Sequence, residues 1–503
     1  MGDGGGGGGS PERRAAGAAF RDGGAEDGAR SRTELDPRVR EIRASQRDAA
    51  LGRAAQIRHG GAQGSEKELI DICWGDAHST GIKPLSFVRQ VLAACLHPEL
   101  LHSDRLPVDA RQRAQRLLGE CEGGSLGSYT HSCGLPHVRR SVAEFITRRD
   151  GGVASLPENI FISLGSQRAL TLVLSLLAQG EGVSRTGVLT PAPACYTVAM
   201  ALAAVGVAPV PYHLCEEQGW ALRVDEVRRV LRASRGHCDP RVLYVVNPGN
   251  PTGHVQSKES IEQVIRLAAE ERLILVVNEV DQDSVHGEGS EFVSYRKVLF
   301  EMGPQFSDAI ELISLHSISR GLMGEGGLRA GYMEVLNVDP AVISTFQQTL
   351  LSVDICPPVP GQIALDLMAC PPRPGDPSHA TYAKEVQTQR DALIGNVRRA
   401  REVLDSLPGV SCQTGAGGHY LFPRLHLPTA AVEQARSAGV EADLLYSRQL
   451  LEEEGLFVGP GCEFGQREGT YHIRLHVMAC PEVLEDALGR LKRFHLRFMR
   501  AFS

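Results

Sequence analysis

The stretch RVLYVVNPGNPTG, at residues 241–253, decides the fold of this 503-residue chain. Its first half is an almost continuous apolar run rich in valine, which is typical of a strand buried on both faces of a sheet. Prolines and glycines fill its second half, where they end the strand and shape a tight loop. The stretch therefore predicts a buried strand that carries a polar loop at its carboxyl end.

Other apolar runs have the same strand character, and helical segments separate them. The segment 257–272, SKESIEQVIRLAAEER, places Ile261, Val264 and Ile265 on one face and begins at Ser257, a good helix cap. Strands and helices in alternation predict an α/β fold, with a large domain whose mostly parallel sheet has helices on both faces. The strand-like runs lie at residues 159–165, 186–193, 273–280 and 309–317.

The pattern changes after residue 357, where a long helical region (378–406) leads into short strand-like segments. This change predicts a smaller α+β domain beside the large one. The start of the chain is rich in glycine, alanine and arginine, a composition that does not pack a core. The predicted divisions are a disordered head (1–33), an N-terminal helical segment with part of the small domain (34–115), the large domain (116–356) and the C-terminal small domain (357–503).

The overall composition excludes several classes of function. A net charge of −7 and a pI of about 6.2 indicate no basic surface for nucleic acid or anionic membranes. No apolar run reaches the roughly 18 residues that a membrane-spanning helix needs. The twelve cysteines form no C-x-x-C pair and no cluster at zinc-ligand spacing, which predicts reduced thiols and no metal site. Acidic residues in the head argue against a mitochondrial presequence, so we expect a cytoplasmic protein.

Polar residues follow several of the predicted strands at the point where each strand ends. The carboxyl ends of parallel strands meet at one edge of a sheet, and ligands of open α/β sheets bind outside that edge. The sequence therefore predicts a single ligand site built from four segments, at residues 165–168, 247–253, 278–281 and 317–320.

Five phrases resemble one enzyme family in their order along the chain. They are GDAH…KPLSFVRQVLA (75–93), CEGGSLGSYTHSCGLPHVRRSVAEFITRRDGG (121–152), VNPGNPTG (246–253), YRKVLFEMGP (295–304) and GPGCEFGQREGTYHIRL (459–475). Over about residues 66–500 the chain resembles the alanine aminotransferases, or glutamate–pyruvate transaminases. The resemblance implies fold type I of the pyridoxal phosphate (PLP) enzymes and the reaction of L-alanine with 2-oxoglutarate to give pyruvate and L-glutamate.

Several positions keep the residue type with which the family holds PLP. The resemblance places Asn250 against the ring oxygen and Arg329 on the phosphate, for which a guanidinium is a good two-point donor. Ser166 and Gln167 lie in the phosphate turn at a helix start, where backbone N–H groups favour an anion. Together with Ser317 of the phrase SISR, these residues form the predicted cofactor site.

Other matching positions concern the substrate and a neighbouring subunit. The resemblance assigns Arg474 to the α-carboxylate of the substrate and Gly75 to the small residue beside which the substrate approaches. Tyr129 matches a tyrosine that reaches the phosphate of the neighbouring subunit in related dimers. The expected ligand is therefore an amino acid or a 2-oxo acid, and the expected assembly is a homodimer or a mixed dimer with an active paralogue.

The residues that carry the chemistry of the family are substituted. Arg320 stands at the position of the Schiff-base lysine, and a guanidinium stays protonated and cannot replace a neutral amine. Asn278 replaces the aspartate beside the pyridine nitrogen, and Asp281 replaces the tyrosine that donates to the ring oxygen. Cys195 occupies the position of the aromatic that stacks on the ring, with Tyr196 next to it.

These substitutions predict a catalytically impaired alanine aminotransferase homologue, in which no covalent aldimine forms and non-covalent binding of PLP is an open question. An active PLP-dependent alanine aminotransferase is the first alternative. A non-catalytic binding or regulatory partner of an active paralogue is the second. The third is a sensor of anions or amino acids that uses Arg168, Arg329 and Arg474 without PLP.

Overall fold

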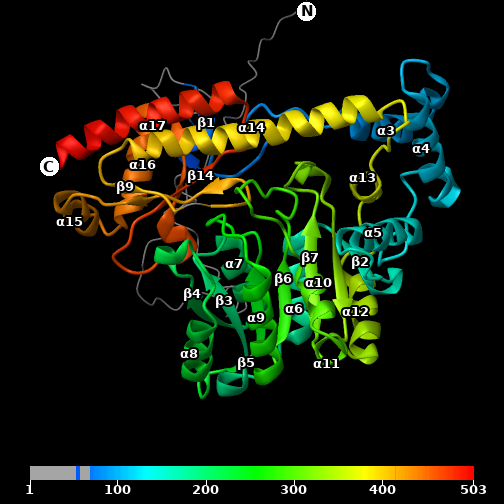
Figure 1. Ribbon diagram of the computed structural model, residues 1–503, viewed down its shortest axis with the longest axis horizontal. Helices are drawn as coiled ribbons and strands as arrows, with labels where there is room; N and C mark the ends of the chain where they lie inside the picture. Colours follow the sequence, from blue (N-terminus) through cyan, green and yellow to red (C-terminus); the bar gives the residue numbers. More distant parts are fainter. Residues whose placement is uncertain (1–51, 57–67, 414) are drawn as a thin grey trace, which may run out of the picture.

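A computed structural model describes residues 52–56, 68–413 and 415–503 of the chain (Figure 1). The predicted head, residues 1–33, lies outside the described residues. A seven-stranded sheet forms the centre of the larger layer, and two long helices lie above it with several short strands (Figure 1). None of the helices in the described part of the chain combines the length and the hydropathy that crossing a membrane requires.

The central sheet is mostly parallel, as the sequence predicts. Its strand order is β2-β8-β7-β6-β5-β3-β4, and β8 is the strand that runs antiparallel to both of its neighbours. The strands are β2 (Ile160–Ser163), β3 (Thr186–Ala192), β4 (Ala208–His213), β5 (Asp239–Val246), β6 (Ile274–Asn278), β7 (Leu312–Ser317) and β8 (Gly331–Leu336).

Five of these strands coincide with the predicted apolar runs, whereas β4 and β8 were not predicted. In β4 the prolines Pro209 and Pro211 alternate with buried residues, and they are tolerated because β4 is an edge strand. In β8 the charged Glu334 interrupts the apolar run, but the side chain is buried and pairs with Arg296 at 3.0 Å. Both strands therefore contain residue types that are unusual in strands, which is why their apolar pattern did not predict them.

Helices cover both faces of the sheet. Along β5, Val242 and Tyr244 face one helical layer while Leu243 and Val245 face the other, since successive side chains of a strand point to opposite faces. The first layer holds α6 (Ser166–Leu177), α7 (Tyr196–Val205) and α12 (Pro340–Val353). The second holds α8 (Val224–Ser234), α9 (Lys258–Glu271), α10 (Tyr295–Glu301) and the short α11 (Pro304–Ser307).

The start of α9 follows the predicted cap. The hydroxyl oxygen of Ser257 accepts a hydrogen bond from the backbone N–H of Ser260 at 3.2 Å. This bond satisfies one of the backbone donors that the first turn of a helix leaves unpaired. The predicted helix and its cap at Ser257 are therefore confirmed.

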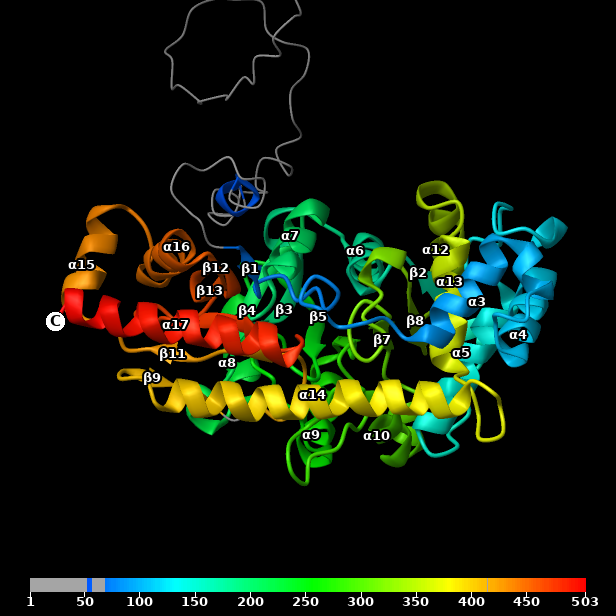
Figure 2. The same cartoon turned by 90° about the horizontal axis from the view of Figure 1, so that it is seen from above.

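A third apolar cluster lies at the β2 end of the sheet (Figure 2). It joins helices from distant parts of the sequence, including the N-terminal helices that precede the first strand of the sheet. Its helices are α3 (Ser86–Leu96), α4 (Val108–Gly119), α5 (Pro136–Arg149) and α13 (Val359–Ala369).

The C-terminal layer rests on two long helices that lie side by side, α14 (His379–Asp405) and α17 (Pro481–Ala501) (Figures 1 and 2). The predicted helical region 378–406 is confirmed as α14. β1 (Ile70–Asp71) pairs in parallel with β12 (Leu456–Phe457), which ties the N-terminal segment to this layer. Its other elements are β9 (Val410–Ser411), β10 (Tyr420–Leu421), β11 (Arg424–Leu425), α15 (Thr429–Ser437), α16 (Ala442–Glu454), β13 (Gly459–Pro460) and β14 (Ile473–His476).

Candidate functional site

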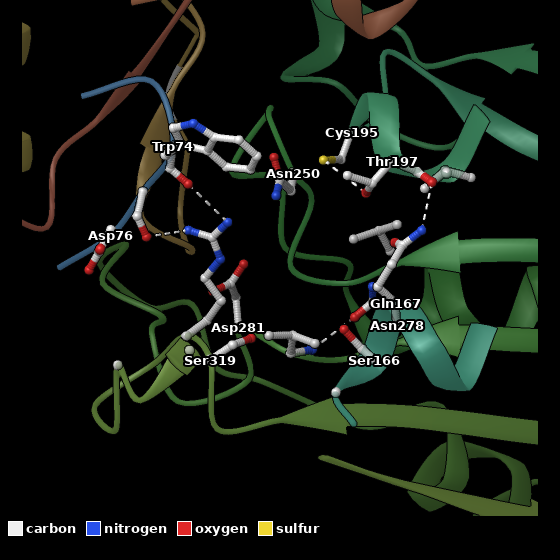
Figure 3. A pocket seen from close by; sticks show the side chains of 18 of the residues that line it. Trp74, Asp76, Ser166, Gln167, Cys195, Thr197, Asn250, Asn278, Asp281 and Ser319 are labelled. Carbon is white, nitrogen blue, oxygen red and sulfur yellow. Dashed lines mark hydrogen bonds between the residues drawn. The ribbon is translucent and has the colours of Figure 1, made fainter. Parts of the chain in front are cut away.

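A cavity of about 740 Å³ lies at the carboxyl ends of the central strands (Figure 3). All four of the predicted segments contribute to its lining, together with residues of the N-terminal segment and of β14. The contributions of the predicted segments are Gly165, Ser166, Gln167, Pro248, Asn250, Asn278, Val280, Asp281, Ser319 and Arg320. The parallel strands thus gather at one place residues that are far apart in the sequence.

One end of the cavity is the start of α6. Gly165 has a φ of 100°, a backbone conformation that favours glycine, and no side chain caps the helix that follows. A Cβ at Gly165 would lie 3.2 Å from Nη2 of Arg329, so the absence of a side chain lets this guanidinium approach the helix. Arg329 donates to the backbone oxygens of Gly326 at 2.9 Å and Leu164 at 2.7 Å. Helix N–H groups and a guanidinium together favour an anion at this end.

Two predicted residues near this end do not line the cavity. Arg168 forms a two-point ion pair with Asp354 at 2.8 and 3.1 Å, so a carboxylate already compensates its charge, and its use for an anion stays a prediction. Ser317 is only 1% exposed and does not line the cavity; its hydroxyl accepts from the N–H of Ser319 at 3.0 Å. Ser319 lines the cavity in its place.

Arg320 is hydrogen-bonded to the N-terminal segment. Its Nη1 donates to the backbone oxygen of Gly75 at 2.7 Å, and its Nη2 donates to the backbone oxygen of Trp74 at 3.3 Å. The guanidinium also lies 5.1 Å from the centre of the Tyr420 ring. Among the described residues that line the cavity there is no lysine.

Gly75 leaves room for these contacts. Its φ is 71°, and a Cβ there would lie 2.1 Å from Nη1 of Arg320 and 2.2 Å from the hydroxyl of Tyr420. Any larger residue would therefore displace either the backbone or the guanidinium. The predicted Gly75 position is inside the cavity, beside Arg320 rather than beside a lysine.

Arg474, in β14, is 2% exposed and lines the same cavity. It donates to Oδ1 of Asn250 at 3.1 Å and to the backbone oxygen of Cys73 at 2.5 Å, and it lies 4.3 Å from the centre of the Tyr420 ring. Its Nε has no hydrogen-bond partner among the described residues. Tyr420 thus contacts two guanidinium groups, from Arg320 and Arg474.

Asn278 pairs with a tyrosine that the sequence analysis did not identify. Its Nδ2 donates to the hydroxyl of Tyr244 at 3.0 Å, and its Oδ1 accepts from the N–H of Val280 at 3.2 Å. Burial raises the pKa of Tyr244, so the pair is neutral. Tyr244 belongs to the apolar run of β5. The one feature of the sequence that could have indicated a role in the site is its hydroxyl group between apolar neighbours.

Asp281 is a buried carboxyl group that lines the cavity. It is 5% exposed, and its Oδ1 has no hydrogen-bond partner among the described residues. Burial raises its pKa to about 6, although the charge of Arg320 opposes the shift. At neutral pH this carboxyl group is therefore mostly ionised but easily protonated.

Cys195 precedes α7, and its sulfur accepts from the hydroxyl of Thr197 at 3.3 Å. Burial opposes ionisation of this thiol, but the charge of Arg474 and the bonds to Thr197 outweigh it, so the pKa of Cys195 is lowered. Tyr196 also lines the cavity and packs edge to face against Trp74, with ring centres 6.3 Å apart. Tyr129 does not line the cavity, and its side chain is 75% exposed.

This arrangement defines a class of protein: a mostly parallel sheet with helices on both faces, a smaller C-terminal layer and an anion-favouring cavity at the strand ends are the features of the PLP-dependent aminotransferases. The model of the family "Aminotransferase class I and II" matches residues 98–491. The chain is 46% identical over 472 residues to "Alanine aminotransferase 1" of Homo sapiens, covering 93% of this chain and 95% of that protein. It is 45% identical over 472 residues to "Alanine aminotransferase 2" of Xenopus laevis, covering 93% and 87%.

Among solved structures, the chain is similar to "Alanine aminotransferase from Pyrococcus furiosus", with a TM-score of 0.72, 20% sequence identity and coverage of 92% of this chain and 100% of that chain. This likeness shows the fold. Sequence and structure together show that the chain belongs to the alanine aminotransferase family, with PLP fold type I.

The residues of the cavity fit PLP at one end only. At the start of α6, helix N–H groups and Arg329 form a donor set that suits a phosphate, as the family implies. At the other end the part of the chain that the structure describes contributes no lysine to the cavity, and the guanidinium of Arg320 cannot form a Schiff base. Within the described residues no group of three or more His, Cys, Asp or Glu side chains is placed to hold a metal ion.

Proposed function

We propose that this chain is an alanine aminotransferase homologue in which transamination is strongly impaired. The observation that carries the proposal is the position of Arg320, whose side chain donates hydrogen bonds to the backbone oxygens of Trp74 and Gly75 in a cavity where no lysine is among the described lining residues. A lysine serves this chemistry because its neutral amine attacks a carbonyl and carries a proton. A guanidinium has neither property at physiological pH.

Two neighbouring residues support the same proposal. PLP-dependent transamination needs a protonated pyridine ring as an electron sink, which a carboxylate partner maintains. Asn278 is neutral and already bonded to Tyr244 and Val280. Asp281 is an acceptor when ionised, so it cannot stabilise a negative ring oxygen. The proposed impairment therefore involves three functions of the site: the amine that forms the Schiff base, the carboxylate beside the pyridine ring and the donor to the ring oxygen.

We further propose that the cavity still binds small anions. PLP would be held without a covalent bond, with its phosphate at the start of α6 and Arg329. An amino acid or a 2-oxo acid would place its carboxylate against Arg474, which is buried and lines the cavity. These ligands follow from the family and from the donor groups at the two ends of the cavity.

The first experiment is formation of pyruvate from L-alanine by the purified chain, with excess PLP and 2-oxoglutarate. An Arg320→Ala variant, prepared in the same way, controls for host transaminase. We expect the two proteins to show the same background rate. Turnover that scales with the amount of wild-type protein and is lost in the variant would contradict the proposal.

A second candidate function is that of a non-catalytic subunit. Tyr129 is 75% exposed, and the apolar side chains of Leu351, Val353 and Ile355 are also exposed at the end of α12 and in the loop after it. These residues offer a surface for a second aminotransferase chain, in a homodimer or a mixed dimer. Sedimentation of the chain alone and with an active alanine aminotransferase tests this function, and a monomer in both samples would contradict it.

A cytoplasmic location stays a prediction.

A further inference from the structure

A second cavity, of about 130 Å³, lies at the edge of the central sheet opposite to the strand-end cavity described above. Arg241, Ile274 and Glu311 line it at the amino ends of β5, β6 and β7, and the helices α6 and α12 supply further lining residues. We call it the α6–α12 cavity. The two cavities share no lining residue, so this one is separate from the predicted cofactor site.

Apolar side chains form most of the wall of the α6–α12 cavity. Val173 of α6, Ile313 of β7 and Phe346 of α12 are buried around it, at 3%, 5% and 3% exposure. Val342 of α12 also lines the cavity but is 36% exposed, which places it at the opening. Apolar protein cavities of about 150 Å³ stay dry and hold one benzene ring. The size and the lining of this cavity therefore suit a ligand with a single ring.

Two opposite charges complete the lining. The side chains of Arg241 and Glu311 are half-buried, and neither makes a hydrogen bond or an ion pair with another described residue. Burial raises the pKa of Glu311, and the charge of Arg241 opposes this shift. Asp339 also lies near Glu311, but its carboxylate caps α12 by accepting from the N–H of Ala341 at 2.7 Å. The charges of Arg241 and Glu311 thus influence each other, and both remain accessible to a ligand.

We propose that the α6–α12 cavity binds an uncharged ring compound with a primary amide head, the ring among the apolar side chains and the amide between Arg241 and Glu311. The amide oxygen accepts from the guanidinium, and the amide N–H groups donate to the carboxylate. A carboxylate head would meet Glu311 and an ammonium head would meet Arg241, so each charged head faces one like charge. The inference does not depend on whether the chain transaminates.

The experiment compares three probes that share a ring and differ in the charge of the head: benzamide, benzoate and benzylamine. Each is titrated with the full chain at pH 7, and the NMR signals of its ring protons report binding. Benzamide should bind about tenfold or more tightly than the two charged probes, the value of a hydrogen bond to a charged group. Excess PLP should leave the affinity for benzamide unchanged, because PLP belongs to the other cavity.

Two variants test the charges separately. Glu311→Gln removes the like charge that opposes benzoate, so the affinity for benzoate should rise about tenfold. Arg241→Gln should raise the affinity for benzylamine by the same factor, for the same reason. Each variant is the control for the other, since Glu311→Gln should not improve benzylamine and Arg241→Gln should not improve benzoate.

A third variant tests the place of binding. Val342→Phe fills the opening with a larger side chain and should weaken benzamide binding about tenfold or more. Val108→Phe is the matched control, because Val108 is also an exposed valine in the first turn of a helix, 45% exposed, but does not line the cavity. It should leave the affinity within about twofold of wild type. Urea unfolding of both variants shows that they are folded.

Four results would overturn the inference. They are no binding of benzamide at millimolar concentrations, equal affinities for the three probes, displacement of benzamide by PLP, and a folded Val342→Phe variant that binds benzamide as wild type does. Displacement by PLP would place the probe in the strand-end cavity. The pyruvate-formation assay tests the proposed function alone, since the α6–α12 cavity shares no residue with that site.

Discussion

The two ends of the cavity follow different rules. At the α6 end, the donors are backbone N–H groups of a helix start and a guanidinium that approaches a glycine. At the other end, Arg320, Asn278 and Asp281 lie at or after the ends of β7 and β6, which pair normally with their neighbours, and the proposed impairment rests on the side chains at these three positions. The comparison teaches that the start of a helix supplies anion donors through the fold itself, whereas a Schiff base requires one particular side chain, which the fold alone does not supply.

The largest effect is expected when the family's residue types are restored at positions 320, 278 and 281. A triple variant, Arg320→Lys with Asn278→Asp and Asp281→Tyr, should raise the rate of L-alanine transamination about 10²–10⁴-fold over wild type, the range of a proton-transfer group. The measurement is pyruvate formation with excess PLP. The double variant that keeps Arg320 is the control and should stay at background. An equal gain without the lysine would mean that Arg320 is not the decisive residue.

Asp281 offers a second test, on stability. Its pKa of about 6 is above the unfolded value, so its favourable contribution is present below about pH 4 and is lost as the pH rises through 6. Asp281→Asn should therefore increase the free energy of unfolding at pH 7 by about 3 kcal/mol, with little difference at pH 4. Urea unfolding at both pH values measures this. An unchanged or lower stability of the variant at pH 7 would contradict the burial argument.

The anion end is tested with a cofactor and its analogue. Arg329→Ala should weaken binding of PLP about tenfold to a hundredfold, the value of hydrogen bonds to a charged group. Binding of pyridoxal, which has no phosphate, should change little. Absorbance titration measures both affinities. Arg168→Ala is the matched control, because Asp354 already compensates that charge; an equal loss in both variants would remove the distinction between the two arginines.

The smallest effect is expected far from the cavity. Ser257→Ala removes the cap of α9 and should lower the free energy of unfolding by about 1 kcal/mol. Binding of PLP and L-alanine should stay as in wild type, since the substitution changes the scaffold and not the site. Chemical denaturation gives the stability and dialysis gives the affinities. A change in affinity would show that scaffold and cavity are energetically coupled.

Much of the fold could be predicted because its signals are local. Apolar runs and turn residues mark β5, β6 and β7, and a serine before an amphipathic segment marks α9. The parallel topology then places the polar ends of these strands at one edge. Pro209 and Glu334 hid β4 and β8, because an edge position and a buried partner are properties of the folded chain and not of the sequence window.

The contacts within the site were less predictable for the same reason. Arg168 pairs with Asp354, which is 186 residues away, and no local pattern signals such a partner. Tyr244 is part of an apolar strand, and only the folded arrangement turns its hydroxyl towards Asn278. Residue identity could suggest which chemistry is missing, but it could not show what each remaining group contacts.

The backbone oxygens of Cys73, Trp74 and Gly75 have a mechanical consequence. Arg320, in the loop that follows β7, donates to two of them, and Arg474, in β14 of the C-terminal layer, donates to the third. The main chain at residues 73–75 is therefore hydrogen-bonded to both layers at adjacent peptide groups. A shift of one layer relative to the other would lengthen these hydrogen bonds at the same time, so this segment resists such a shift.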